Sequence, residues 1–417
     1  MLPQLRELEQ RIGPEMVVIG VHSAKFLAEQ ATENLRDAVL RYGVEHPVVN
    51  DRDFAVWNEY AVRAWPTLMF IDPAGRVIAK HEGEAPIAAL ERVVREMLDE
   101  FRAAGLLDTS RPLPVHEESL ATRGALAFPG KVAADPMGER LAVADTNHDR
   151  VLVIDQSGRL LRAFGGLSRP QGLAFDGGRL WIAETGAHSV HLADLETGSL
   201  RRVAGTGSAA MSTADLAAGA LRSPWDLCVV NGSVYVAMAG SHQIWRLDAA
   251  SGGIEPFAGS GREGLRDGPL ADAWLAQPSG IAAGAGALWV ADSEVSAVRR
   301  IDLDRREVQT VVGLDLFEFG DVDGAGDEVR LQHPLGVAWW EGGGRVVIAD
   351  SYNSKIKLLD PERRAVTTLA GSAHEFNEPG GVAVLGDVAY VADTNNHALR
   401  GVSLTSGEIG GVELSGT

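Results

Sequence analysis

From residue 124 onward, apolar and polar positions follow one pattern that occurs six times. Each copy has an apolar strand opened by Pro, a second apolar strand, a tight turn, and then a third and a fourth strand. Repeats of this length with short strands predict a six-bladed β-propeller over residues 124–417, in which every blade packs on its neighbours. The ring is expected to close without an exchanged strand. The opening prolines are Pro129, Pro170, Pro224, Pro278, Pro334 and Pro379.

The second strand of each copy ends in an acid, which we call the anchor acid. Asp and Glu in tight turns accept backbone N–H groups, so we predict a structural task for them. Histidine or serine follows within four residues, and a residue repeated from blade to blade is expected to pair with the turn backbone in each. The anchor acids are Asp145, Glu184, Asp292, Asp350 and Asp393, with Met238 in the third copy. The residues that follow are His148, His188, His242, Ser296, Ser354 and His397.

Departures from the repeat indicate where function lies. Lys131 and Asp226 replace the Gly of the Pro-x-Gly start, and residues 206–223, 261–277 and 314–333 are longer than a blade needs. These connections share one propeller face with the turns between second and third strands. Since binding residues concentrate on loops held by a rigid scaffold, we expect the functional face there. The candidate binding residues are Asp226, Met238, His242, Asp267, Asp321, Asp323 and His333.

The stretch from Asp321 to Glu328 resembles a calcium loop in its spacing. That loop type requires Glu at its twelfth position, where this chain has Gln332. We therefore predict no metal, and instead an Asp-Gly turn leading into a short helical turn, here and at Asp267.

Residues 1–102 alternate predicted helices and strands, which indicates an α/β layer. Helical spacing covers 1–12, 26–42, 54–62 and 86–101. The apolar run 16–21 predicts a buried parallel strand, and 67–79 predicts a hairpin. Residues 103–123, which contain Pro112 and Pro114, are interpreted as a linker.

The segment Ala64-Trp65-Pro66-Thr67, in front of an apolar strand and a Gly hairpin, resembles the thioredoxin-like superfamily. The resemblance implies a cis Pro66 beside a redox site, which makes Trp65, Pro66 and Thr67 candidate binding residues. The first strand and the Cys-x-x-Cys pair of that family are missing. The domain is thus either redox-inactive, or the natural protein has cysteines upstream of Met1.

The motif from Ala392 to His397, Ala-Asp-Thr-Asn-Asn-His, resembles the NHL-repeat family. With the first domain, the whole chain resembles NHL-repeat-containing proteins that join a thioredoxin-like domain to a six-bladed propeller. This resemblance implies no established reaction. Some NHL-like lyases hold a metal in the channel with several histidines, so a metal-dependent lyase or hydrolase remains an alternative.

Composition narrows the function classes. The net charge is −19 and no basic run occurs, so nucleic acid and anionic membranes are not expected partners. The single cysteine, Cys228, lies in an apolar run and is expected to be buried; it excludes an intrachain disulfide and indicates a cytoplasmic protein. No phosphate loop or nucleophile elbow is present, and no cofactor is predicted.

The sequence therefore predicts a binding or scaffold protein. Its propeller face would hold a protein or peptide, and the thioredoxin-like domain would be redox-inactive as given. Whether the protein is an enzyme stays open. The alternatives are a thiol-disulfide oxidoreductase or peroxidase-like protein with cysteines upstream of Met1, and the metal-dependent enzyme of the channel.

Overall fold

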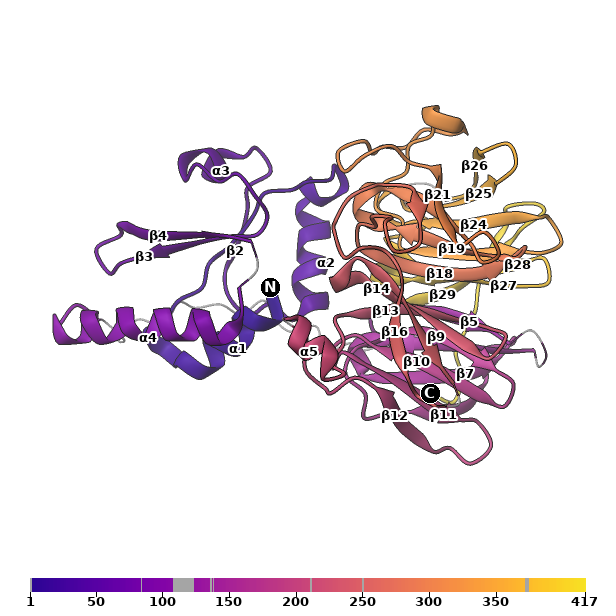
Figure 1. The fold of residues 1–417 in the computed structure, drawn as a ribbon, viewed down its shortest axis with the longest axis horizontal. Coiled ribbons are helices and arrows are strands. Elements are labelled where there is room, and N and C mark those ends of the chain that lie inside the picture. Colours follow the sequence, from indigo (N-terminus) through magenta and orange to yellow (C-terminus); the bar gives the residue numbers. More distant parts are fainter. Residues whose placement is uncertain are drawn as a thin grey trace. The chain divides into compact units, whose positions relative to one another are not determined.

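The structure is a computed structural model that describes residues 2–83, 85–107, 124–135, 137, 139–210, 212–249, 251–371 and 375–417. The chain divides into two compact units, Met1–Ala121 and Thr122–Thr417, which are considered separately (Figure 1). The predicted linker 103–123 falls mostly outside the described residues. In the described part of the chain, no helix combines the length and apolar character needed to cross a bilayer.

The first unit mixes helices with two small sheets. Strand β1 pairs with β2 in parallel, and β3 with β4 antiparallel. Helix α1 packs on α4 through an apolar cluster that includes Leu8, Leu90 and Val94. The helices are α1 (Leu2–Ile12), α2 (Thr32–Tyr42), α3 (Ala55–Glu59) and α4 (Ile87–Ala103), with 3-10 turns η1 (Gly13–Glu15) and η2 (Ala28–Gln30). The strands are β1 (Gly20–His22), β2 (Val48–Asn50), β3 (Thr67–Ile71) and β4 (Val77–Glu82).

The apolar run 16–21 is not the buried strand that the sequence predicted. Only Gly20–His22 is strand, and Val17, Ile19 and Val21 are 55%, 56% and 44% exposed. The prediction is wrong because β1 has a single partner strand, β2, and these side chains remain uncovered in the described unit. The Trp65–Pro66 peptide bond is cis, as the resemblance implied.

The second unit is the predicted six-bladed propeller. Each blade is one sheet built from consecutive strands, so none of the named strands is exchanged at the closure. Near the C-terminus, Ser415 makes a single parallel bridge with Arg159 of blade one. The innermost strands are β5 (Val132–Ala134), β9 (Pro170–Asp176), β13 (Pro224–Val230), β18 (Pro278–Gly284), β23 (Gly336–Trp340) and β27 (Pro379–Leu385). The second strands are β6 (Arg140–Asp145), β10 (Arg179–Glu184), β14 (Ser233–Met238), β19 (Ala287–Asp292), β24 (Arg345–Asp350) and β28 (Val388–Asp393).

The outer half of each blade completes the sheet. The third strands are β7 (Arg150–Asp155), β11 (Ser189–Asp194), β15 (Gln243–Asp248), β20 (Ala297–Asp302), β25 (Lys355–Asp360) and β29 (Ala398–Ser403). The fourth strands are β8 (Leu160–Phe164), β12 (Leu200–Ala204), β16 (Ile254–Ala258), β21 (Glu307–Val312), β26 (Ala365–Ala370) and β30 (Ile409–Gly411). Five 3-10 turns join second to third strands: η3 (Thr146–His148), η4 (Ala239–Ser241), η5 (Ser293–Val295), η7 (Ser351–Asn353) and η8 (Thr394–Asn396).

The apolar core lies between the blades. The innermost strands contact one another around the ring, and β27 contacts β5 to close it. Aromatic side chains on the second strands fill the space between neighbouring sheets, as predicted, and each removes a large apolar area from water. These are Trp181, Tyr235, Trp289 and Tyr390, all less than a tenth exposed.

The same hydrogen bond joins every blade to the next. The residue four positions after the anchor position has φ between 48° and 54°, and its side chain accepts the backbone N–H of the residue before the next opening Pro. His188, His242 and His397 thus pair with backbone, as predicted, but with that of the next blade and not with that of their own turn. The six pairs are Asp149–Arg169, His188–Ser223, His242–Gln277, Ser296–His333, Ser354–Glu378 and His397–Phe128.

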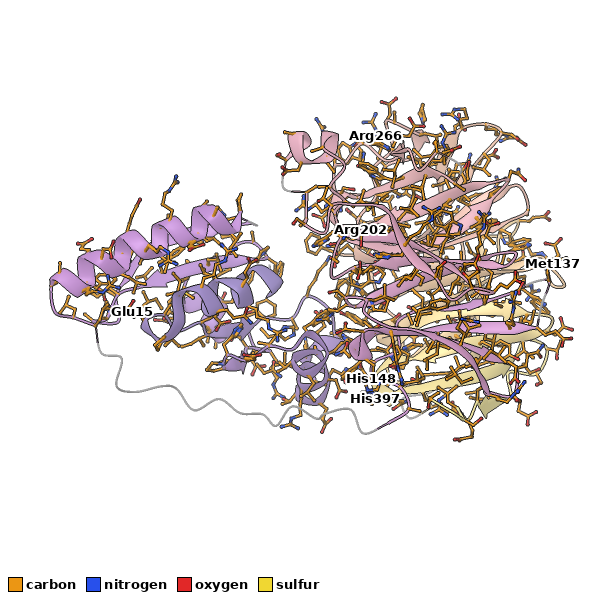
Figure 2. All side chains as sticks on the ribbon, turned by 90° about the horizontal axis from the view of Figure 1, so that it is seen from below. Glu15, Met137, His148, Arg202, Arg266 and His397 are labelled. Carbon is orange, nitrogen blue, oxygen red and sulfur yellow. The ribbon has the colours of Figure 1, made fainter. Side chains whose placement is uncertain are left out.

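The last of these pairs joins blade six to blade one and so closes the ring. Figure 2 labels His397. Its Nδ1 lies 3.1 Å from the backbone N of Phe128. His148 differs from the other histidines because it precedes the shared position by one. Its Nδ1 instead lies 2.7 Å from a carboxylate oxygen of Asp145.

A second hydrogen bond crosses five of the six joints. The hydroxyl one position after the anchor donates to the carbonyl of the next opening Pro, at 2.6–2.8 Å. The third blade has Ala239 there and lacks the hydroxyl. The five donors are Thr146, Thr185, Ser293, Ser351 and Thr394.

The Ala239→Ser variant should therefore be more stable. Ser293 and Ser351 show that this position accommodates a serine hydroxyl, which would donate to the carbonyl of Pro278. We expect the free energy of unfolding to rise by about 1 kcal/mol, measured by chemical denaturation. Thr394→Val is the opposite control and should lower it by about 1–2 kcal/mol, because the Pro129 carbonyl loses its donor. A destabilised Ala239→Ser would contradict the equivalence of the joints.

Candidate functional site

Each anchor acid holds the start of its own blade. One carboxylate oxygen accepts a backbone N–H two residues before the opening Pro, at 2.6–2.8 Å. The predicted structural task is present, but the N–H belongs to the segment before the first strand and not to the turn. The other oxygen faces a basic side chain on the third strand. In the five blades concerned these side chains are Arg150, His191, Arg299, Lys357 and Arg400.

Blade three has lost both members of this pair. Met238 stands in place of the acid and is fully buried, and Trp245 stands where blades four and five have a cation. The Trp245 indole N–H donates to Gln243 Oε1 at 3.1 Å. The candidate Met238 is thus part of the apolar core between blades and is not presented to a ligand.

In blade four the buried cation also holds a long loop. Arg299 has no exposed side-chain surface, and its guanidinium lies 2.9 Å from both Asp292 and Asp267. It also donates to the backbone carbonyls of Arg266 and Trp274. The loop 261–277 is therefore fixed to the third strand by one buried side chain.

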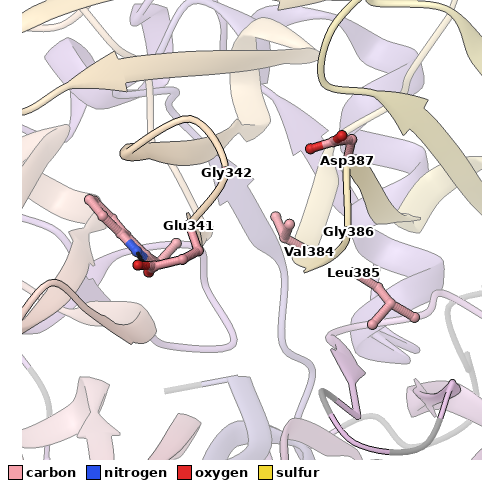
Figure 3. A pocket seen from close by; sticks show the side chains of 7 residues that line it. Glu341, Gly342, Val384, Leu385, Gly386 and Asp387 are labelled. Carbon is pink, nitrogen blue, oxygen red and sulfur yellow. Dashed lines mark hydrogen bonds between the residues drawn. The ribbon is translucent and has the colours of Figure 1, made fainter.

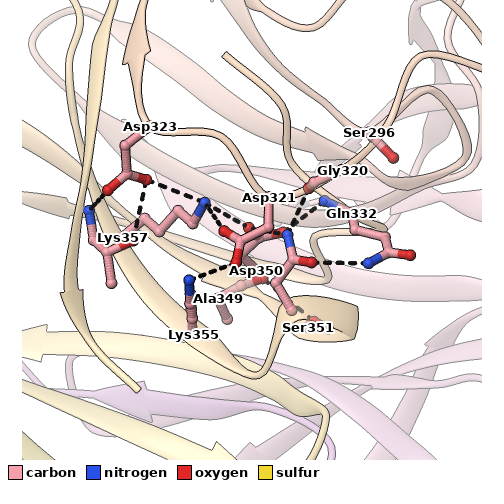
Figure 4. A network of polar contacts seen from close by, with 12 residues as sticks. Ser296, Gly320, Asp321, Asp323, Gln332, Ala349, Asp350, Ser351, Lys355 and Lys357 are labelled. Carbon is pink, nitrogen blue, oxygen red and sulfur yellow. Dashed lines mark hydrogen bonds and ion pairs between the residues drawn. The ribbon is translucent and has the colours of Figure 1, made fainter. Parts of the chain in front are cut away.

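Blade five repeats this arrangement with lysine (Figure 4). The fully buried Lys357 ammonium lies 2.8 Å from Asp321, 3.2 Å from Asp323 and 3.3 Å from Asp350. Lys355, partly exposed, contacts the other oxygen of Asp321. The candidates Asp321 and Asp323 thus fix the loop 314–333 to its blade.

The two loops add a short strand to the outer edge of their blades. β17 (Gly268–Pro269) pairs with β21, and β22 (Gly324–Ala325) pairs with β26. The preceding Asp267 and Asp323 accept the backbone N–H and hydroxyl of Thr310 and Thr368. The prediction of a plain Asp-Gly turn is wrong here. These carboxylates bind the outer strand, and the residues that follow them pair with that strand. A 3-10 turn, η6 (Gly326–Glu328), then follows in the second loop.

Burial and charge set the protonation of this network. Burial raises the pKa of Asp292 and of Asp350 to about 6, against the opposing effects of Arg299 and Lys357. For Asp321, burial is outweighed by hydrogen bonds from Lys355 and Lys357, and its pKa is lowered. The carboxylates in the loop thus stay ionised and paired at neutral pH.

No metal site emerges among the described residues. None of their His, Cys, Asp and Glu side chains form a group of three or more that could hold an ion. The carboxylates of Asp321 and Asp323 are engaged by lysines and Thr368, and Gln332 donates to Asn353.

The loop 314–333 presents an apolar tip. Phe317 is 69% exposed and Val322 is 46% exposed. The backbone around them is held by hydrogen bonds between Val322 and Arg330 in both directions, and the Arg330 guanidinium lies 3.1 Å from Glu318. Aromatic side chains are enriched among the residues that contribute most to binding at protein interfaces.

The remaining candidates do not converge on one site. Asp226 lies on the innermost strand of blade three, and His242 is used in the joint to blade four. His333 stacks on Tyr352 with ring centroids 4.5 Å apart, and its backbone N–H donates to Ser296. In the first unit, Trp65 packs on Trp57 at 4.4 Å.

The surroundings of Trp65 are polar on one side. Its indole N–H donates to the carbonyl of Ser23 at 2.8 Å, and Thr67 donates to the carbonyl of Ala64. Asp51 accepts the backbone N–H groups of Val56 and Trp57 and the hydroxyl of Ser23. These bonds place Trp65, 48% exposed, at the carboxyl end of β1.

One groove of about 300 Å³ lies between the hairpin turns of blades five and six (Figure 3). These turns join first to second strands, at the propeller face opposite the long loops. Its two carboxylates are already engaged, because Glu341 accepts from Trp339 and Asp387 from Trp340. The groove residues are Trp339, Glu341, Gly342, Val384, Leu385, Gly386 and Asp387.

Three residues that shape the loop face were not predicted from the sequence: Arg299, Lys357 and Phe317. The two cations share one repeat position, directly after the apolar residue that opens the third-strand pattern at Val298 and Ile356. Basic residues recur at this position as His191 and Arg400, and this recurrence was a usable signal. Phe317 had none, since one aromatic residue in a loop does not reveal its exposure.

Comparison with known proteins agrees with this architecture. The NHL repeat family model matches residues 221–247 and 376–402. NHL repeat-containing protein 2 of Gallus gallus is 38% identical over 467 aligned residues, covering 97% of this chain and 64% of that protein. Protein SUPPRESSOR OF QUENCHING 1, chloroplastic, of Arabidopsis thaliana is 38% identical over 98% of this chain and 43% of its own length. The chain thus spans less than two thirds of these relatives.

A solved structure gives the same fold at low identity. The auxiliary nutrient binding protein from Bacteroides thetaiotaomicron has a TM-score of 0.51 and 16% identity, over 69% of this chain and 70% of that one. This similarity concerns the fold alone. The six blades, the matched repeats and the similarity over 97% of this chain lead to one conclusion: the chain carries an NHL-repeat propeller and is a homologue of NHL repeat-containing protein 2.

Proposed function

We propose that this protein is a binding or scaffold protein that holds a protein or peptide partner on the propeller face formed by the loops 261–277 and 314–333. One observation carries the proposal: in the loop 314–333, Asp321 is bound by the buried Lys357, while Phe317 is 69% exposed. A loop that is ordered before binding loses little conformational entropy when a partner docks.

The charge of this loop favours a particular kind of partner. Asp315, Glu318, Asp327 and Glu328 of this loop are exposed, and Glu318 and Asp327 pair with Arg330 and Arg364. Because the chain as a whole carries −19, a partner surface with basic residues around an apolar pocket would complement Phe317 and its acidic surroundings.

We also propose that residues 1–102 are a thioredoxin-like domain that is redox-inactive in this chain. Thiol exchange requires an accessible thiolate. Cys228, the one cysteine, is buried in the propeller, and burial, together with the nearby Asp226, raises the pKa of its thiol.

A second candidate is a thiol-disulfide oxidoreductase or peroxidase-like protein whose cysteines lie upstream of Met1. The uncovered side chains of Val17, Ile19 and Val21, beside a strand with one partner, favour it. A further strand in a longer chain would pair with the open edge of β1.

The 417-residue chain should not reduce insulin disulfides in the presence of dithiothreitol above the rate of dithiothreitol alone. The Cys228→Ser variant is the control and should behave identically, since the thiol is buried. Turnover in the parent chain that is lost in Cys228→Ser would contradict redox inactivity. Cys-x-x-Cys in the reading frame upstream of Met1 would instead support the second candidate.

Photo-crosslinking tests the partner face. A benzophenone amino acid at Phe317 should give a discrete crosslinked species in cells, seen by gel shift and identified by mass spectrometry. The same group at Leu161, which is 43% exposed on the outer strand of blade one, is the matched control and should give little. Equal yields of the same species at both positions would contradict a specific site at the loop.

Removal of the buried lysine should loosen the loop. Lys357→Met leaves Asp350 buried without its cation, so the free energy of unfolding should fall by about 3–5 kcal/mol. Hydrogen exchange in 314–333 should quicken, and crosslinking at Phe317 should fall. Lys355→Met is the matched control, because Lys355 is partly exposed and should cost about 1 kcal/mol or less. Equal effects of both variants would show that the buried cation is not what holds the loop.

A further inference from the structure

Two charged residues stand at the starts of the innermost strands, at the position where four blades have glycine. Gly172, Gly280, Gly336 and Gly381 occupy this position, and the exceptions are Lys131 and Asp226. The strands are very close together here. A Cβ on Gly172 would lie 2.4 Å from the Cα of Asp226, and one on Gly381 would lie 2.7 Å from the Cα of Lys131.

Lys131 of blade one reaches past the adjacent blade six to blade five. Its ammonium donates to the carbonyl of Gly380 in blade six, at 2.8 Å, and to the carbonyl of Leu335 in blade five. The residue is 3% exposed. The Lys131 ammonium is therefore buried between the starts of the innermost strands of blades five and six.

Asp226 makes the corresponding connection on the other side. Its carboxylate accepts the backbone N–H of Ile281 in blade four at 3.1 Å and that of Leu227 in its own strand at 2.9 Å. It is 8% exposed. Together the two side chains contact five of the six blades.

The two charges act on each other through space. Burial lowers the pKa of Lys131 to about 8, and Asp226 partly offsets this shift. Burial raises the pKa of Asp226 to about 6, and Lys131 partly offsets that shift. A lone buried charge destabilises the fold, so each of these residues reduces the free-energy cost of burying the other.

We propose that Lys131 and Asp226 form one internal cross-brace that fixes the ring of the propeller and fills its channel, so that ligands bind on the outer faces and not in the channel. Lys131 and Asp226 are two departures from the repeat at the same position, with opposite charge. Their role in the ring does not depend on which partner the loop face binds.

A double-mutant cycle tests the coupling. Lys131→Met and Asp226→Asn should each lower the melting temperature of the full chain by roughly 5–15 °C, because each leaves one buried charge uncompensated. The double variant should lose clearly less than the sum of the two. Strictly additive losses would overturn the cross-brace. Lys131→Gln replaces Lys131→Met in the cycle if the latter does not fold.

The matched control uses another buried lysine. Lys357→Met combined with Asp226→Asn should give additive losses, because Lys357 pairs with Asp321, Asp323 and Asp350. Coupling as large as that with Lys131 would indicate a general effect of lost lysine and would overturn the pairing.

Chemical rescue tests the filled channel. In Lys131→Gly, which restores the glycine of the repeat, ethylammonium chloride should raise the melting temperature relative to the same concentration of sodium chloride. The parent chain should show no such difference, because its own ammonium already occupies the space. Equal shifts in parent and variant, or none in the variant, would overturn the channel assignment.

Discussion

The propeller depends on satisfying one backbone N–H at the start of each blade. The residue before each opening Pro has φ between 45° and 59°, and its N–H points to the previous blade. A buried N–H without an acceptor costs about as much as a lost hydrogen bond. In all six joints, from Asp149 to His397, a side chain of the neighbouring blade accepts this N–H. Closure of the ring between His397 and Phe128 uses the same bond as every internal joint, which explains why no exchanged strand is needed.

Buried charge explains which departures from the repeat occur together. Blade three has Met238 in place of the acid, and its third strand has Trp245 in place of the cation. Keeping one of them alone would leave a charge in the apolar core between blades, which costs several kcal/mol. The opposite case is found at the ring centre, where Lys131 and Asp226 are both gained. Substitutions that look unrelated in the sequence are thus matched through the electrostatics of the core.

The repeat made most of the fold predictable, because six copies of one pattern define each strand, turn and anchor acid independently. The tasks of Asp393 and His397 followed from repetition for the same reason. Contacts between segments without a repeat relation could not be predicted. Lys357 binds Asp321, which lies 36 residues earlier, and no local pattern links them. The prediction of a buried strand around Val17 was wrong for a different reason. Its apolar content is typical of a buried strand, but burial also requires another element that covers it, which the local sequence does not reveal.

The three long loops differ in how they are ordered, and this difference bears on where binding takes place. The loop 206–223 enters blade three, which has no buried cation; it relies on the short helix α5 (Thr213–Ala217), capped by Ser212, and on a bridge between Ala209 and Leu221. The loops of blades four and five are held instead by Arg299 and Lys357. Arg299 donates hydrogen bonds to two backbone carbonyls of its loop, and Lys357 pairs with two carboxylates of its loop. Ordering a long loop costs backbone entropy for every residue fixed. A buried cation offsets that cost before any partner arrives, so the loops of blades four and five are the ones prepared to bind without rearrangement.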